Sequence, residues 1–442
     1  MRARRLSAVV LAFAVALAVF AATRGDERAA AGPLRVAGQS ALDLRPDANT
    51  DARIAALQAD VRAGRTDRVA ALAAAYLQKV RETGDASYYT RADGLLRRAL
   101  ARDPRDQATL VQAATLAAAR HDFRGALRIA RRAAAVLPGT LAPLPVTVDA
   151  LVELGRYRAA ERTLQRLVDL KPNLTAYARV SYFRELSGDL PGAIAAMGRA
   201  VSAGGPAPEN VAYVQSLLGG LELARGHVGA ARHAYEAALA AMPGYAPAAA
   251  GRARVAAVGG DLRGAIARWR RVVARLPLPE YVIALGETEL AAGRRSAGRR
   301  DLQLVHVQER LLAAAGVNTD VELAIFEADH GSRARGVALA RAAWASAPSV
   351  RAADALGWAL ARAGRARAGL RWAHRALRLG SLDPAFRYHA GMTALAAARL
   401  AAAGSARAAR LAAEGRRDLR LALAHGLGAQ PLPAARAKEA LR

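Results

Sequence analysis

Proline recurs in this chain at a constant spacing of 34 residues. The residues that share this interval are Pro104, Pro138, Pro172 and Pro206, and further along Pro243 and Pro277. Because proline lacks a backbone N–H and its ring clashes with the preceding turn, a helix does not continue through these positions. A fixed period of this length is typical of chains built from small units that bury their apolar faces against one another. The spacing therefore favours a stacked array of short helical units.

The segments between these prolines share an inner pattern of small residues. In Ser216–Gly244, Gly219 lies in a first predicted helix and Gly226 marks the turn to a second. The same pattern recurs at Gly260, Ala265, Trp269 and Pro277, and at Gly357, Gly364, Gly369 and Ala376. A glycine within a helix costs about 1 kcal/mol relative to alanine. We therefore expect Gly357 to admit a closely packed second helix, and Gly364 to end a helix in the left-handed conformation.

This pattern resembles the tetratricopeptide repeat (TPR) family, whose period is 34 residues. The resemblance covers residues 53 to about 426 and implies an all-α fold, a right-handed α-solenoid of about ten helix-turn-helix repeats. Segments such as Tyr177–Asp189 also resemble exported bacterial members of the family that have no assigned catalysis. The family implies that the first helix of each pair lines the concave face of the superhelix.

Two helix pairs depart from the pattern. The first is expected to contain a long loop around Glu82–Thr90, and the seventh lacks its closing proline, which indicates an extended second helix. The expected boundaries are a signal peptide or N-terminal membrane anchor over 1–22, a flexible linker over 23–50, the solenoid over 51–430 and a C-terminal capping helix over 431–442.

The N-terminus predicts export. Arginines at positions 2, 4 and 5 precede an uninterrupted apolar run, Leu6–Ala22, with small residues near its end. This arrangement is typical of a secretory signal, although the run also approaches the length of an uncleaved membrane anchor. The chain is therefore expected to be secreted or anchored at the outer face of the cytoplasmic membrane.

The charge of the chain is strongly positive and comes from arginine. Lys and Arg number 65 against 37 Asp and Glu, a formal charge of +28. The arginines are spread along the whole chain, whereas a nucleic-acid or anionic-surface binder is expected to gather them in one patch. Both a functional basic surface and a compositional bias stay open. The absence of cysteine excludes disulfides and thiolate metal sites.

No catalytic motif is found in the sequence. No lysine follows a glycine, as a phosphate-binding loop requires, and no two histidines lie four residues apart, as in zinc peptidases. Asp329 and His330 are adjacent, which does not orient a catalytic triad. Glu287 and Glu289 are two positions apart on a predicted helix and are expected to be solvated, and His121 and His330 are expected at turns. We therefore predict no enzyme, cofactor or metal site.

Binding is expected in the concave groove. The candidate groove residues are Asp149, Arg179, Phe183, Tyr213, Arg254, Tyr281, Asp354 and Trp358. Tyr213 and Tyr281, near helix starts, are expected to be more exposed than Phe183 and Trp358, for which packing between repeats is the alternative.

Two hypotheses about function follow from the sequence. The first is a non-catalytic scaffold outside the cytoplasm that binds a partner protein or peptide in the groove of a TPR superhelix. The second is an electrostatic binder of anionic cell-envelope polymers or lipid surfaces. Nucleic acid is not expected as the partner of an exported chain.

Overall fold

The computed structural model describes residues 50–204 and 208–442, which form helices and no strands. The first helices of ten successive pairs are α3 (Val69–Thr83), α5 (Gln107–Ala119), α7 (Leu144–Glu153), α9 (Leu174–Leu186), α11 (Pro208–Ala224), α13 (Ala246–Val258), α15 (Pro279–Ala291), α17 (Asp320–His330), α19 (Val350–Arg362) and α21 (Pro384–Arg399). The second helices are α4 (Ser87–Arg102), α6 (Phe123–Val136), α8 (Tyr157–Leu170), α10 (Leu190–Ser202), α12 (Val228–Ala241), α14 (Leu262–Arg275), α16 (Arg295–Ala314), α18 (Arg333–Ser346), α20 (Ala366–Ala376) and α22 (Ala406–Ala424). The array is preceded by α2 (Thr50–Arg62) and followed by α23 (Pro431–Leu441).

The small residues of the repeat act as the sequence predicts. A Cβ on Gly357 of α19 would lie 3.0 Å from the backbone nitrogen of Ala373 in α20, so the glycine admits the second helix of its pair. Gly364, in the turn between these helices, has a φ of 78°, which glycine adopts without strain. The expected close approach and the expected left-handed turn are both confirmed.

Of the two expectations about irregular helix pairs, one is confirmed and the other is wrong. The extended second helix of the seventh pair is confirmed, because α16 has 20 residues. The long loop expected in the first pair is wrong, because only Gly84, Asp85 and Ala86 separate α3 from α4. The helix α4 begins at Ser87, so the tyrosines of this stretch are helical, and the Asp85 carboxylate just before it accepts a hydrogen bond from the Ser87 N–H at 2.9 Å.

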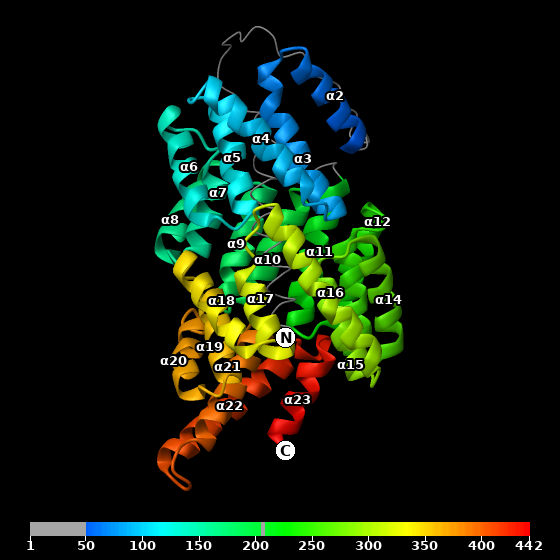
Figure 1. Ribbon diagram of the computed structural model, residues 1–442, viewed down its shortest axis with the longest axis vertical. Coiled ribbons are helices and arrows are strands. Elements are labelled where there is room, and N and C mark those ends of the chain that lie inside the picture. The colour runs from blue at the N-terminus through cyan, green and yellow to red at the C-terminus, as the bar shows by residue number, and fades with distance from the viewer. Residues whose placement is uncertain (1–49, 205–207) are drawn as a thin grey trace.

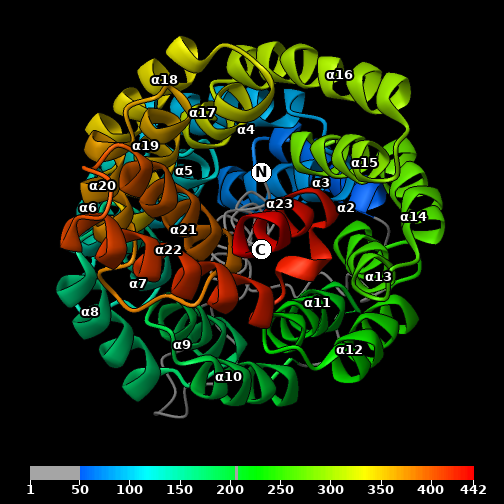
Figure 2. The ribbon, with the colours of Figure 1, turned by 90° about the horizontal axis from the view of Figure 1, so that it is seen from below.

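The helix pairs wind into a superhelix whose successive turns touch (Figures 1 and 2). The Val350 N–H donates to the Tyr157 hydroxyl at 2.9 Å, across 193 residues. His425 Nδ1 lies 3.3 Å from the Ala224 carbonyl oxygen, across 201 residues. About six 34-residue repeats therefore complete one turn. Apolar contacts cross the same boundary, since Val350 joins the core of α5–α11.

The first helices face the inside of the superhelix. Viewed along the axis, α11, α13 and α15 lie inward of α12, α14 and α16 (Figure 2). Their burial is almost continuous, and in α19 every residue from Val350 to Leu360 is buried. A helix that is buried on all sides lies in a core. The concave face is therefore largely covered, which the resemblance to open repeat arrays does not predict.

The ends of the chain bear on three of the expected boundaries. The expected signal or anchor over 1–22 and nearly all of the linker over 23–50 lie outside the described residues, whereas Thr50 already begins α2. Over the described ranges, no helix has the length and apolar character needed to cross a membrane. The helix α23 packs on α22 and also contacts α15, three pairs earlier in the chain; its capping role stays a prediction.

Candidate functional site

Five of the eight candidate groove residues are held inside the helical array. Asp149 and Arg179 form a buried ion pair, in which Arg179 Nε and Nη2 donate to the two carboxylate oxygens at 2.8 and 2.6 Å. Burial raises the pKa of Asp149 to about 6, and the Arg179 guanidinium opposes that rise. Phe183 is half-buried against the same core. These residues link α7 to α9.

Asp354 and Trp358 belong to a second buried network. Asp354 Oδ2 lies 2.8 Å from His389 Nδ1, and Trp358 stacks on the His389 ring with centroids 4.4 Å apart. Trp358 Nε1 donates to the Asp329 carboxylate at 3.0 Å. Burial lowers the pKa of His389, although Asp354 opposes the effect. Trp358 therefore packs between repeats, which is the alternative that the sequence left open for it.

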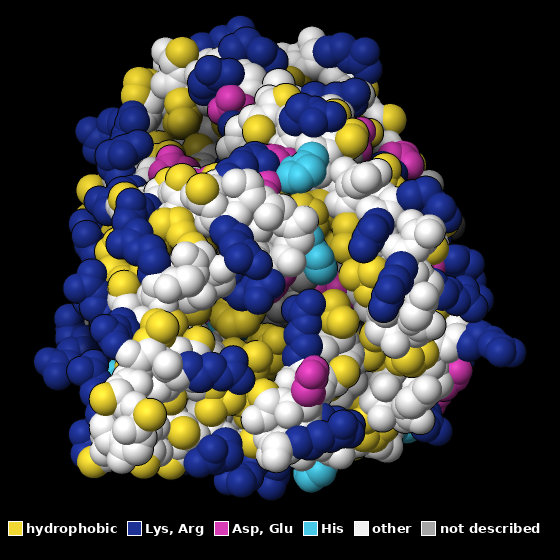
Figure 3. All heavy atoms as spheres, turned by 60° about the horizontal axis from the view of Figure 1, so that its bottom comes forward, with side chains coloured by type: hydrophobic (Ala, Val, Ile, Leu, Met, Phe, Trp, Pro, Cys, Tyr) yellow, Lys and Arg dark blue, Asp and Glu magenta, His cyan; other side chains and the backbone are white. Residues whose placement is uncertain are grey.

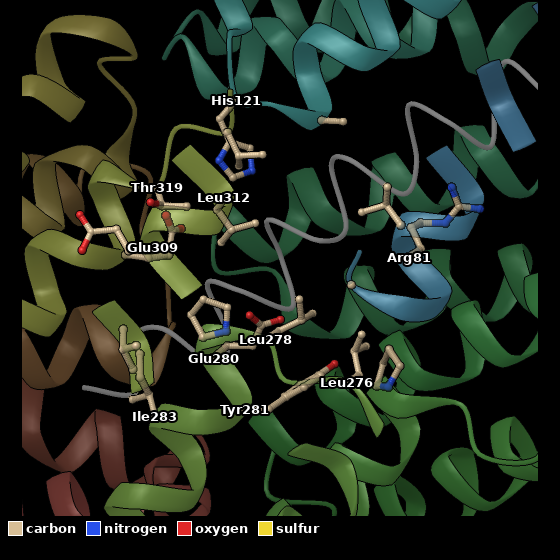
Figure 4. Close-up of a pocket in the computed structure, with 18 of the residues that line it drawn as sticks. Arg81, His121, Leu276, Leu278, Glu280, Tyr281, Ile283, Glu309, Leu312 and Thr319 are labelled. Carbon is tan, nitrogen blue, oxygen red and sulfur yellow. The ribbon is translucent and has the colours of Figure 1, made fainter. Parts of the chain in front are cut away.

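The remaining three candidates, Tyr213, Arg254 and Tyr281, line one cavity of about 230 Å³ inside the superhelix. Figure 4 shows side chains from distant parts of the chain converging on it: Arg81 from α3, His121 after α5, Tyr281 from α15 and Leu312 from α16. These three candidates belong to the fifth, sixth and seventh repeats, and their neighbouring first helices bring them together, as expected. Tyr213 is half-buried, but the expected exposure of Tyr281 is wrong, because only 4% of it is accessible.

The walls of the cavity are mainly aliphatic. Their aliphatic members are Val80, Leu217, Leu276, Leu278, Ile283, Val305, Leu312, Val317 and Leu323. They come from the first turn of the superhelix and from the following turn, which meet here. Such a concave apolar site with a few polar groups is the usual form of a ligand-binding pocket.

The tyrosines of the cavity are held as neutral hydrogen-bonding groups. Burial raises the pKa of Tyr89 to about 12, and burial also raises the pKa values of Tyr213, Tyr245 and Tyr281. All four hydroxyls therefore keep their protons at neutral pH and are able to donate hydrogen bonds into the cavity.

Two arginines line the cavity in different electrostatic states. Arg81 Nη2 donates to Glu209 at 3.0 Å, so this guanidinium is paired. Arg254 is 7% exposed, and its Nε and Nη2 make no hydrogen bond to any described residue. Its guanidinium lies 5.7 Å from the centre of the Trp269 ring. A buried cation without hydrogen-bond partners at two nitrogens is costly.

The carboxylates of the cavity have interactions of their own. Glu309 is hydrogen-bonded to Arg335, and Glu322 lies 3.7 Å from Arg351. Glu280 is also engaged in an interaction. Glu309 and Glu322 thus have cationic neighbours, whereas no acidic residue among those described forms an ion pair with Arg254. The Arg254 guanidinium lies instead near the Tyr235 hydroxyl, whose pKa it lowers against the rise that burial causes.

The sequence did not identify most of the polar lining. Arg81, His121, Glu309 and Glu322 belong to repeats that are far apart in the chain and meet only because the superhelix closes. His121, half-buried, contacts the Asn318 carbonyl oxygen across the two turns. These residues could be predicted from the sequence only if the number of repeats in one turn of the superhelix were known. The repeat period does not give that number.

The structure overturns one expectation about carboxylates. Glu287 and Glu289, expected to be solvated, are fully buried. Glu287 Oε1 lies 3.2 Å from His330 Nε2, and Glu289 accepts from Arg270 Nη2 at 2.7 Å. The first helix α15 is covered on both faces, which the alternation of its residues does not reveal. Within the described residues, no group of three or more possible ligands is placed to hold a metal ion.

The arginines of the face drawn in Figure 3 are not gathered in one place. Figure 3 shows Lys and Arg side chains over the whole visible face, with a smaller number of acidic side chains among them. Some arginines form ion pairs, such as Arg335 with Glu309 and Glu327. A distributed charge of this kind lacks the focused patch of a polyanion site.

Comparisons with known proteins concern the fold. No protein-family model matches the sequence, and no curated protein matches it. A tetratricopeptide repeat protein from Parabacteroides merdae is 15% identical, with a TM-score of 0.40, over 60% of this chain and 98% of that one. The structure of the APC/C hetero-tetramer Cut9-Hcn1 is 13% identical, with a TM-score of 0.36, over 89% and 90%. The human IFIT1 dimer with m7Gppp-AAAA is 15% identical, with a TM-score of 0.46, over 72% of each chain.

The repeat period, the ten helix pairs and the inward first helices define the class of fold. The chain forms an all-α solenoid of the TPR type. Its distinguishing feature is the interior cavity that lies between two contacting turns.

Proposed function

We propose that this protein is a non-catalytic interaction scaffold that receives a segment of a partner protein or peptide in the interior of its superhelix. The observation that carries the proposal is the convergence of Tyr213, Arg254 and Tyr281, from three consecutive repeats, on one apolar cavity. Tyrosine and arginine are the residue types enriched at the energetic centres of protein interfaces.

The burial of the first helices limits the size of the bound segment. A long extended peptide would need a continuous exposed concave face, whereas α19 is buried along nearly its whole length. A cavity of about 230 Å³ accommodates one or two side chains. The partner therefore inserts a short element, and the rest of it lies outside the superhelix.

The site of action is part of the same proposal. The positive and apolar N-terminal sequence supports export, with the solenoid secreted or held at the outer face of the cytoplasmic membrane. Binding of anionic envelope polymers through the arginine-rich surface is the competing function, and the experiment below separates the two.

Photo-crosslinking in the native cell tests the proposed function. Probes at Tyr213 and Leu312, on different walls of the cavity, are compared with a probe at Arg271, which is exposed on α14. Capture of the same protein from both cavity positions but not from Arg271, unchanged by moderate salt, supports the scaffold. Salt-sensitive capture of polymer or lipid from all three positions contradicts it and supports the electrostatic function.

A further inference from the structure

Arg254 is a charged group of the cavity whose hydrogen-bonding capacity is only partly used. Arg254 is more than nine-tenths buried, and two of its nitrogens make no hydrogen bond to any residue that the structure describes. Arg81, the other lining arginine, is paired with Glu209, and Glu309 and Glu322 have cationic partners. Arg254 is therefore a lining cation without an acidic partner among the described residues.

The residues near Arg254 suit an anion with an apolar body. Tyr281 lines the same cavity as Arg254. Burial and the Glu280 carboxylate raise the pKa of Tyr281, and the Arg254 guanidinium opposes that rise. A protonated phenol and a guanidinium both donate hydrogen bonds to a carboxylate. The aliphatic walls bury whatever carries that carboxylate.

We infer that the cavity binds an aliphatic carboxylate, with the carboxylate at Arg254 and the hydrocarbon among the aliphatic walls. The inference rests on the proposed function, because it names what a partner segment presents to the cavity: an aliphatic side chain next to Asp or Glu. The same chemistry is offered by a free fatty acid, so the experiment includes both sources.

The burial of the Arg254 guanidinium gives an independent readout. Arg254→Met removes a buried charge with two nitrogens that make no hydrogen bond, while keeping an apolar stem of similar length beside Trp269. The ligand-free variant should therefore melt at a higher temperature than the parent protein. Arg252→Met on the same helix is the matched control, because Arg252 is hydrogen-bonded to Glu236 away from the cavity.

Titration calorimetry with small probes tests the chemistry directly. Octanoate should bind one site per chain at least about tenfold more tightly than octanol or octylammonium, because only the carboxylate satisfies the buried guanidinium. Arg254→Met should abolish that preference, and Arg252→Met should keep it. Equal binding of octanoate and octanol, or a preference that survives in Arg254→Met, overturns the inference.

A second pair of probes distinguishes the two sources. A leucyl-glutamyl-leucine peptide blocked at both ends should bind at least about tenfold more tightly than its glutamine counterpart, and only when Arg254 is present. If octanoate shows the preference and neither peptide binds, the carboxylate site stands and the insertion of a partner segment fails. If photo-crosslinking captures a partner while no carboxylate is preferred, the proposed function stands and this inference fails.

Discussion

The buried ion pair between Asp149 and Arg179 offers a quantitative test of the interior packing. Arg179 is 1% exposed and donates, besides its two bonds to Asp149, to the carbonyl oxygens of Pro145 at 3.2 Å and Thr175 at 3.0 Å. Removing one member of such a pair leaves the other charge buried and unpaired. We expect Asp149→Leu and Arg179→Met each to lower the free energy of unfolding by about 3–5 kcal/mol at pH 7.5.

The two single variants should respond differently to acid. Arg179 keeps its charge at any accessible pH, so the deficit of Asp149→Leu persists at pH 5. In Arg179→Met, the carboxylate of Asp149 loses the cation that lowers its pKa, and the pKa rises above its present value of about 6. In this variant Asp149 therefore takes up its proton in the folded state at a higher pH than in the parent. It gains more stability than the parent as the pH falls from 7.5 to 5, so the deficit of this variant shrinks.

The double variant measures the coupling. Replacing both charges with apolar side chains leaves no buried charge, so Asp149→Leu with Arg179→Met should be within about 1 kcal/mol of the parent or more stable. The matched control is Arg184→Met on the same helix, whose side chain is 49% exposed beside Asp189 and should cost less than about 1 kcal/mol.

Urea unfolding followed by circular dichroism gives these values, and amide exchange of α7 and α9 assigns them to the third and fourth repeats, since repeat arrays do not always unfold in one step. If the single variants cost no more than Arg184→Met, or if their losses simply add in the double variant, the pair is not desolvated and the account of a closed interior is wrong.

Three further predictions address other parts of the fold. Burial lowers the pKa of His389, so below about pH 6.5 the unfolded state binds a proton that the folded state does not bind. The free energy of unfolding should therefore fall with acid by up to about 1.4 kcal/mol per pH unit from this group. Urea unfolding of His389→Gln should show a smaller dependence of stability on pH between pH 6.5 and 5.5, and an identical dependence would contradict the prediction. A Cβ on Gly369 would lie 2.6 Å from the Gly357 carbonyl oxygen, so Gly369→Ala should lower the melting temperature. At Gly198 an added Cβ would meet nothing within 4 Å, so Gly198→Ala should gain up to about 1 kcal/mol of stability from helix propensity. A lower melting temperature in both variants would show that the close approach of the helices is not the cause. Deletion of Pro431–Arg442 removes the contacts of α23 with α22 and α15 and should lower solubility and melting temperature before it affects binding; unchanged melting would refute the capping role.

The repeat could be predicted from the sequence because the residues that define each repeat act within that repeat or on its neighbour. Prolines at a fixed interval, Gly357 in a helix and Gly364 in a turn are recognisable one repeat at a time. The missing proline after the seventh pair likewise predicted the extended helix α16. These features depend on interactions within a helix or between neighbouring helices, which the order of residues encodes directly.

The closure of the superhelix could not be predicted in the same way. It depends on a small rotation between repeats that accumulates over about six of them, and no single residue reports it. For this reason Arg81 and His121, from the first two repeats, share a cavity with residues of repeats far along the chain. Tyr281, Glu287 and Glu289 are buried against expectation because neighbouring helices cover them, as the contacts with Trp269, His330 and Arg270 show. Tyr213, Arg254 and Tyr281 were identified because they lie on neighbouring first helices.

The most direct test of the account is a disulfide across the two turns that enclose the cavity. The Asn318 N–H donates to the Arg120 carbonyl oxygen at 3.0 Å, so the two backbones are within the range that a disulfide spans. The parent chain has no cysteine, so Arg120→Cys with Asn318→Cys is free of background. Rapid oxidation to an intramolecular crosslink is the predicted result. Failure to crosslink, or crosslinks between molecules only, would show an open superhelix without this cavity.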